Sequence, residues 1–153
     1  MLRPAIAVAV VFATACGPPP PPERPPPVFS DEPLSGVVGA APWTFVAGAT
    51  DAFLSDEEGL FSTLSNVDFT ACADTAEGAQ LITSLPREVG VTRLNLGGQS
   101  ITFSPGAGEN LVAIVGAIRI DEISDTTVTG ALKASFDDDN KVDGAFSLTI
   151  CPD

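Results

Sequence analysis

Three stretches near the C-terminus decide the fold: LVAIVGAIRIDE at residues 111–122, TTVTGALKASF at 126–136 and VDGAFSLTIC at 142–151. In each stretch apolar residues recur at every second position, the period of a β-strand with one buried and one solvated face. Turn-forming Ser, Asp and Asn residues separate the stretches. The pattern predicts three successive strands in an antiparallel meander.

The alternation also predicts which side chains enter the core. The outward faces carry Arg119, Lys133 and Asp143. The expected inward-facing residues are Val112, Ile114, Gly116, Ile118, Ile120, Val128, Leu132, Ala134, Phe136, Val142, Phe146, Leu148 and Ile150.

Weaker alternation earlier in the chain predicts strands at 43–47, 67–72, 91–96 and 100–103, with Gly97-Gly98 as a hairpin turn between the last two. No stretch predicts more helix than a single turn at 73–79. We therefore expect an all-β domain over residues 28–153, an antiparallel β-sandwich or open barrel of about eight or nine short strands. Trp43 is expected in its core rather than as a ligand platform.

The N-terminus has the layout of an export signal. Arg3 precedes an apolar run at residues 5–15, which is shorter than the ~20 residues that span a bilayer but suits a secretory signal. The tetrapeptide Ala13-Thr14-Ala15-Cys16 resembles the lipobox of bacterial lipoproteins, although Leu is usual where Ala13 stands. The resemblance implies that residues 1–15 are removed and that Cys16 carries a diacylglyceryl group and an acylated amino terminus. The alternative is an ordinary signal peptide cleaved near Ala15.

A proline-rich spacer follows the predicted lipidation site. Residues 17–27 read GPPPPPERPPP, which can form neither helix nor sheet and favours polyproline II. At ~3.1 Å per residue it reaches roughly 34 Å. We assign 16–27 to the lipidated Cys and spacer, which lifts the β domain off a membrane. By the same resemblance Gly17, which is not Asp, implies the outer membrane of the bacterial envelope.

The other two cysteines, Cys72 and Cys151, are expected to form a disulfide. An exported chain meets an oxidising compartment, and both residues fall on the polar phase of predicted strands. A redox-active pair is the alternative, but the two lack CxxC spacing. A bridge here would fasten the last strand to the domain.

Composition excludes several classes of function. The net charge is −13, and residues 28–153 hold 19 acidic and 5 basic residues, so nucleic-acid binding is not expected. The absence of His from the sequence rules out Ser-His-Asp and Cys-His catalysis and His-ligated zinc. Acidic groups occur at 56–58, 121–125 and 137–143. The last group, Asp137, Asp138, Asp139, Asn140 and Asp143, could bind calcium or could form a turn, and we assign no metal or cofactor.

No catalytic set stands out among the remaining residues. Lys133 and Lys141 are the only lysines, and Lys133, on the polar face of a predicted strand, has no recognisable nucleophile partner. We expect a monomeric, non-catalytic, lipid-anchored envelope domain that binds an unknown envelope protein or ligand or has a structural role. One alternative is a barrel that carries a small apolar ligand, and another is a carboxylate-based hydrolase. A filled core favours the first hypothesis, and a lined cavity of ~300 Å³ or more favours the carrier.

Overall fold

The computed structural model describes residues 24–106 and 108–152, so the predictions for the signal peptide and Cys16 lie outside the described residues. Within them the chain is all-β, without a helix long and apolar enough to cross a membrane. This confirms the predicted fold class. The strands are β1 (Ser35–Val38), β2 (Ala41–Thr44), β3 (Ala47–Thr50), β4 (Gly59–Ser65), β5 (Gln80–Pro86), β6 (Gly90–Arg93), β7 (Ile101–Ser104), β8 (Leu111–Ala113), β9 (Val115–Ile123), β10 (Thr127–Ser135) and β11 (Lys141–Thr149).

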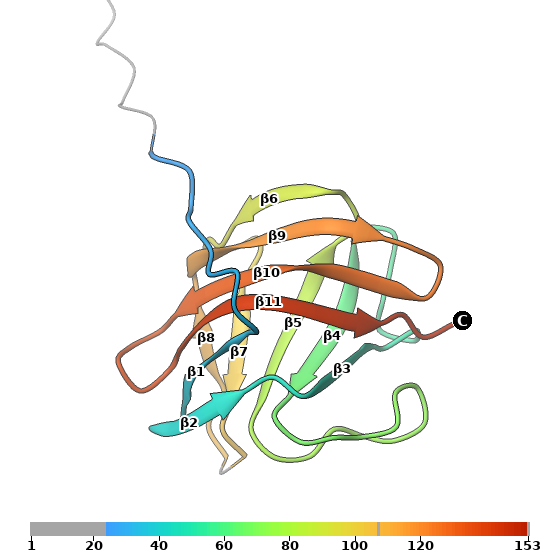
Figure 1. Cartoon of the computed structure of the whole chain (residues 1–153), viewed down its shortest axis with the longest axis horizontal. Helices are drawn as coiled ribbons and strands as arrows, with labels where there is room; N and C mark the ends of the chain where they lie inside the picture. The colour runs from blue at the N-terminus through green and yellow to red at the C-terminus, as the bar shows by residue number, and fades with distance from the viewer. Residues whose placement is uncertain (1–23, 107, 153) are drawn as a thin grey trace, which may run out of the picture.

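All eleven strands belong to one curled sheet, more strands than the sequence suggested. The main order is β6-β9-β10-β11-β3-β4-β5-β7-β8, and the β1–β2 hairpin attaches to β11. Neighbours are antiparallel except β11 and β3, which pair in parallel. Figure 1 shows β9, β10 and β11 crossing in front of β4, β5, β7 and β8, with β6 above β9, so that the sheet curls into a half-barrel.

The predicted C-terminal meander is confirmed as β9, β10 and β11. From Ile118 onward its predicted core positions are right except at Phe136, because Ile118, Ile120, Val128, Leu132, Ala134, Val142, Phe146 and Leu148 are all buried. Ile150, just past β11, is partly buried against the core.

The first predicted strand is wrong in its first half. The predicted strand is interrupted at Ile114, which separates β8 from β9. β8 pairs with β7 at one end of the sheet order, whereas β9 lies between β6 and β10. The phase of alternation changes at this break, so Ala113 is buried while Val112 and Ile114 are exposed. Phe136 is likewise half exposed rather than buried, because it lies in the turn beyond β10.

Three earlier predictions are corrected. Residues 67–72 form no strand but belong to the long loop between β4 and β5. Residues 91–96 and 100–103 do not form a hairpin, since β6 pairs with β9 and β7 with β5. The Gly97-Gly98 turn is still present, closed by the Asn95 N–H donating to Gln99 O at 2.8 Å. The 43–47 stretch is divided between β2 and β3.

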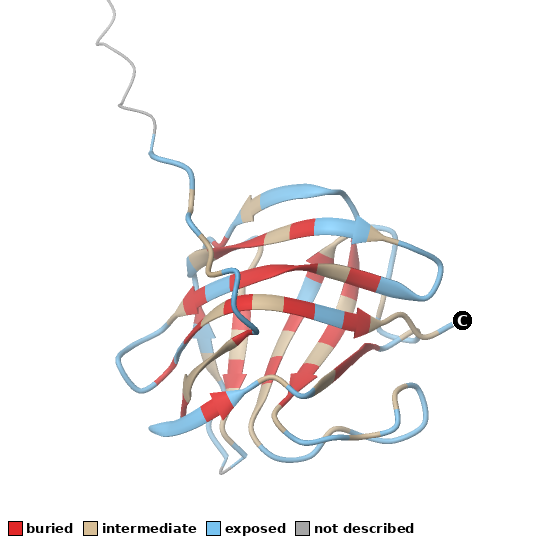
Figure 2. Ribbon diagram, in the orientation of Figure 1, coloured by how far each residue is buried: buried red, intermediate tan, exposed pale blue. Residues whose placement is uncertain are grey.

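The inside of the half-barrel is filled by apolar side chains. Figure 2 shows buried positions recurring along the strands of both layers. Trp43 and Phe103 are the largest fully buried side chains, and leucines and isoleucines from most strands pack with them. Trp43 is 2% exposed and its Nε1–H donates to Ala79 O at 2.8 Å, which confirms its predicted place in the core.

An N-terminal segment crosses the outer face of the sheet (Figure 1). We call residues 25–34 the strap. The Arg93 guanidinium donates to Pro25 O, and the Arg119 guanidinium lies 5.3 Å from the centre of the Phe29 ring. Lys133 Nζ donates to Val28 O at 3.3 Å. The strap therefore runs from β6 over β9 to β10, held by a cation at each strand.

Backbone pairing fixes the end of the strap on β11. Leu34 N–H donates to Ala145 O, and Ala145 N–H donates to Glu32 O, each at 2.8 Å. Ala131 faces outward between Arg119 and Ala145, its neighbours in register, yet it is fully buried. The strap explains this burial, because both neighbours contact it.

Removing the strap's aromatic anchor tests this account. We expect Phe29→Ala to lower the free energy of unfolding by about 1–2 kcal/mol, because partial burial and the cation–π contact with Arg119 are both lost. Urea unfolding measures the change. Val28→Ala is the matched control, since Val28 is 77% exposed and gives the strap only its carbonyl oxygen. Equal unfolding midpoints for the two variants would contradict a packed strap.

Candidate functional site

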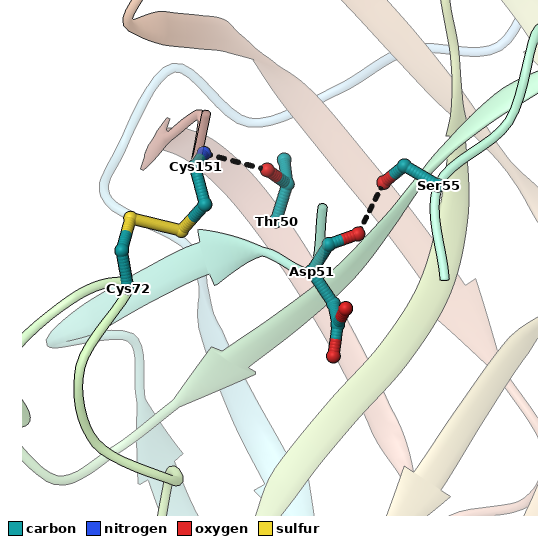
Figure 3. The surroundings of a disulfide bond; sticks show 5 residues. All are labelled: Thr50, Asp51, Ser55, Cys72 and Cys151. Atoms are coloured by element: carbon teal, nitrogen blue, oxygen red, sulfur yellow. Dashed lines mark hydrogen bonds between the residues drawn. A yellow bond between two sulfur atoms is a disulfide. The ribbon is translucent and has the colours of Figure 1, made fainter. Parts of the chain in front are cut away.

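The disulfide predicted from the sequence is present. Cys72 and Cys151 are joined, with their Cα atoms 5.4 Å apart and a sequence separation of 79 residues. The strand placement predicted for Cys72 is wrong: Cys72 lies in a loop turn with a φ of 66°, where the Asp74 N–H donates to Thr70 O at 3.0 Å. Cys151 follows β11, and its N–H donates to Thr50 Oγ1 at 2.9 Å (Figure 3). The bridge thus ties the β4–β5 loop to the ends of β11 and β3.

A cleft of about 510 Å³ opens beside this bridge. We call it the disulfide cleft. Apolar or small side chains make up most of its wall, with threonines and two carboxylates between them. Its lining residues are Ala49, Thr50, Asp51, Ala52, Phe53, Thr63, Phe69, Cys72, Ala73, Asp74, Thr75, Ala76, Cys151 and Pro152.

One rim of the cleft is a tight turn that begins at Asp51. Asp51 O accepts from both the backbone N–H and the Oγ of Ser55, at 2.9 and 2.6 Å (Figure 3). Asp51 Oδ1 accepts from Leu54 N–H at 3.0 Å, and Ser55 Oγ in turn accepts from Phe61 N–H at 3.0 Å. These bonds fix the turn with the Phe53 side chain 95% exposed and Leu54 54% exposed. This exposed pair was not predicted, and its one signal in the sequence is Phe-Leu within the otherwise polar segment DAFLSDEEG.

The charged side chains at this end of the domain are mostly acidic. Asp51 and Asp74 are the charged side chains that line the cleft. Both carboxylates stabilise the loops by accepting backbone hydrogen bonds. Asp51 Oδ1 accepts from Leu54 N–H, and Asp74 Oδ2 accepts from Thr70 N–H at 3.3 Å. The 56–58 group lies on the same loop as Phe53, where Asp56 Oδ1 accepts from Glu58 N–H and Gly59 N–H at 2.9 Å. The arrangement suits binding of a cationic or apolar group.

The 137–143 acidic group is organised as a turn. Asp137 Oδ1 accepts from Asp139 N–H and from Asn140 Nδ2, at 3.0 and 2.9 Å. Asn140 is 3% exposed, and its Oδ1 accepts from Gly39 N–H at 2.8 Å, which joins this turn to the β1–β2 turn. Lys141 donates to exposed Asp138 at 2.9 Å and lowers the pKa of that carboxyl. In residues 24–106 and 108–152 no group of three or more acidic or Cys side chains is placed to hold a metal ion.

The two lysines lie beside a second cleft, of about 390 Å³, on the outer face of β9, β10 and β11. Lys133 Nζ is 2.8 Å from Asp143 Oδ2, and Lys141 pairs with Asp138. Asp143 Oδ1 also accepts from Ser30 N–H of the strap at 2.9 Å. Arg119, on the same face, is 2.8 Å from Asp121, and this hydrogen bond raises the pKa of Arg119. Arg119, Lys133 and Lys141 on this face therefore all form ion pairs with neighbouring carboxylates.

The disulfide gives a direct stability test. We expect the double variant Cys72→Ser, Cys151→Ser to lose about 2–4 kcal/mol of unfolding free energy, because the unfolded chain is no longer closed by a long loop. Urea unfolding of the variant and of the oxidised wild type measures this. Wild type unfolded with reductant is the control and should match the variant. The bridge is absent if both thiols of the unreduced wild type react with an alkylating agent.

A second test separates the turn from a calcium site. Asn140→Ala should cost about 1–3 kcal/mol, because it leaves the Gly39 N–H without its partner. Asp138→Ala, at an exposed position of the same loop, should leave the melting temperature nearly unchanged. Calcium chloride should shift neither the wild type nor the variants. A calcium-dependent rise in melting temperature that Asp138→Ala abolishes would contradict the turn interpretation.

Comparison with protein-family models, curated proteins and solved structures found no match for this chain. Its function is therefore argued from its own residues.

Proposed function

We propose that the protein is a lipid-anchored β domain of the bacterial cell envelope that binds a partner and does not catalyse a reaction. The observation that carries the proposal is Cys16, which follows an apolar signal-like run and ends a lipobox-like tetrapeptide. Two or more acyl chains on one residue suffice for stable anchoring. Gly17, which is not Asp, favours the outer membrane by the same resemblance. The proposal takes the β domain to be a monomer.

The Cys72–Cys151 disulfide supports an exported location. Disulfides persist in oxidising compartments and are rare in the reducing cytosol.

The strap supports the proposal because it fixes where the proline-rich spacer joins the β domain. Arg93 contacts Pro25, so the end of the proline-rich segment is bound to the sheet at β6. In Figure 1 the described chain enters at the upper left, whereas the C-terminus lies at the right. The disulfide cleft, which contains Cys151 and Pro152, is therefore on the side away from residues 24–27, where the described chain begins.

Binding is favoured over the two alternatives. The inside of the half-barrel is filled around Trp43 and Phe103, so a carried apolar ligand would have to use a surface cleft. A hydrolase would need two free carboxylates in one cleft. Asp51 and Asp74 share a cleft, and each accepts one hydrogen bond from a loop N–H, which assigns them a role in holding the loops; no observation assigns either one to acid or base catalysis.

Loss of the anchoring thiol tests this proposal. We expect Cys16→Ala to move the protein from the membrane fraction to the soluble fraction, and its intact mass to lack the acyl groups. Fractionation and mass spectrometry of the expressed full chain measure both. Thr14→Ser should remain anchored, because it leaves small residues before Cys16. The anchor is refuted if Cys16→Ala changes neither membrane association nor mass.

A further inference from the structure

We propose that the disulfide cleft, with Phe53 and Leu54 on its rim, docks a protein segment in which cationic side chains alternate with apolar ones. We call these residues the docking surface. The inference rests on the proposed binding function and specifies its surface and the chemistry of its partner.

The first observation is an aromatic side chain held in solvent. Phe53 is 95% exposed, and Leu54 beside it is 54% exposed. The hydrogen bonds made by Asp51 fix the backbone of the turn, and the Phe53 side chain projects from it into solvent. Aromatic side chains are enriched at protein–protein interfaces relative to the rest of the surface. An already ordered turn also loses little conformational freedom on binding.

The second observation is the shape of the cleft. Its volume of about 510 Å³ falls within the ~300–1,000 Å³ typical of binding pockets. Short side chains, Ala49, Ala73 and Ala76, leave room between the turn and the disulfide, and half-buried Phe69 adds apolar surface. The Cys72–Cys151 bridge fixes one wall. An extended segment could place one apolar side chain in this space.

Charge identifies the occupant as cationic. The two loops that border the cleft, 51–58 and 66–79, carry Asp51, Asp56, Glu57, Glu58, Asp68, Asp74 and Glu77, and neither loop contains Lys or Arg. Arg87 reaches this end, where its Nε–H donates to Asp56 O at 2.6 Å. A partner with Lys or Arg beside its apolar residues is electrostatically complementary to this surface. Anionic headgroups and nucleic acids would be repelled, which disfavours them as occupants.

A binding assay with defined peptides tests the inference. The lipidated full chain in detergent micelles is titrated with three fluorescein-labelled hexapeptides, alternating Lys and Leu, Lys and Ser, or Glu and Leu, and each titration is corrected against empty micelles. Fluorescence anisotropy gives the Kd. The Lys–Leu peptide should bind most tightly, and Phe53→Ala should weaken its binding tenfold or more.

Leu96→Ala is the matched control, because Leu96 is 84% exposed but lies on the β6–β7 loop, outside the cleft. It should change the Kd less than twofold. Both side chains are exposed, so the two variants should keep the wild-type melting temperature. Equal effects of the two substitutions would overturn the inference, as would equal binding of the Lys–Ser or Glu–Leu peptide.

A vesicle assay tests whether the docking surface binds a lipid membrane instead of a protein segment. The Cys16→Ala full chain is mixed with phosphatidylcholine–phosphatidylglycerol vesicles and separated by flotation. We expect no association, and association that Phe53→Ala abolishes would overturn the inference in favour of a membrane. The anchor and the docking surface fail separately. Lys–Leu binding by a chain that Cys16 does not anchor refutes only the anchor, and an anchored chain that does not bind the peptide refutes only the docking surface.

Discussion

The structure depends on one seam, the parallel contact between β11 and β3. Antiparallel pairing links β6, β9, β10 and β11 on one side of it and β3, β4, β5, β7 and β8 on the other. At the seam a single pair, Thr149 with Ala49, lies in register. The Cys151 N–H bond to Thr50 and the Cys72–Cys151 bridge reinforce this short contact. A Cβ at Gly48 would lie 2.3 Å from Leu148 Cδ2 of β11 and 2.9 Å from the backbone oxygen of Thr63 in β4, so β3 lies too close to its neighbours for a larger residue there.

The seam explains why the cleft is where it is. The pair lies at the C-terminal ends of both strands, where the contact continues through Cys151 and Thr50 and where the β3–β4 and β4–β5 loops meet. Ala49, Thr50 and Cys151 belong to the seam, and they also line the disulfide cleft. The bond that stabilises the fold therefore also fixes the wall of the candidate binding surface. The disulfide therefore has two effects. It constrains the unfolded chain, and in the folded domain it positions the loop that carries Phe69 and Asp74.

The sequence was sufficient for the local features and insufficient for the long-range ones. Alternation from Ile118 to Leu148 identified the meander, because hairpin neighbours share one core face. Ile114 was misplaced because alternation cannot show that a chain crosses to another part of the sheet. Gly97-Gly98 marked a real turn, but a turn does not determine which strands pair across it. The disulfide was predicted because only two cysteines remain once Cys16 is assigned to the anchor. The position of Phe53 beside a cleft could not be predicted, because the cleft is formed by segments that are far apart in the sequence.

The charge distribution joins the strap to the docking surface. In a strongly acidic domain, Arg93, Arg119, Lys133 and Lys141 all lie on β6, β9, β10 and β11, and the first three contact the strap. The outer face is thereby occupied by the chain's own N-terminal segment, which leads back toward the proposed anchor. Within residues 24–106 and 108–152, the carboxylates of loops 51–58 and 66–79 form no salt bridge, and Arg87 contacts only the backbone oxygen of Asp56. Internal contacts use the positive charge on one side of the domain, and the negative charge on the other side remains available for a partner.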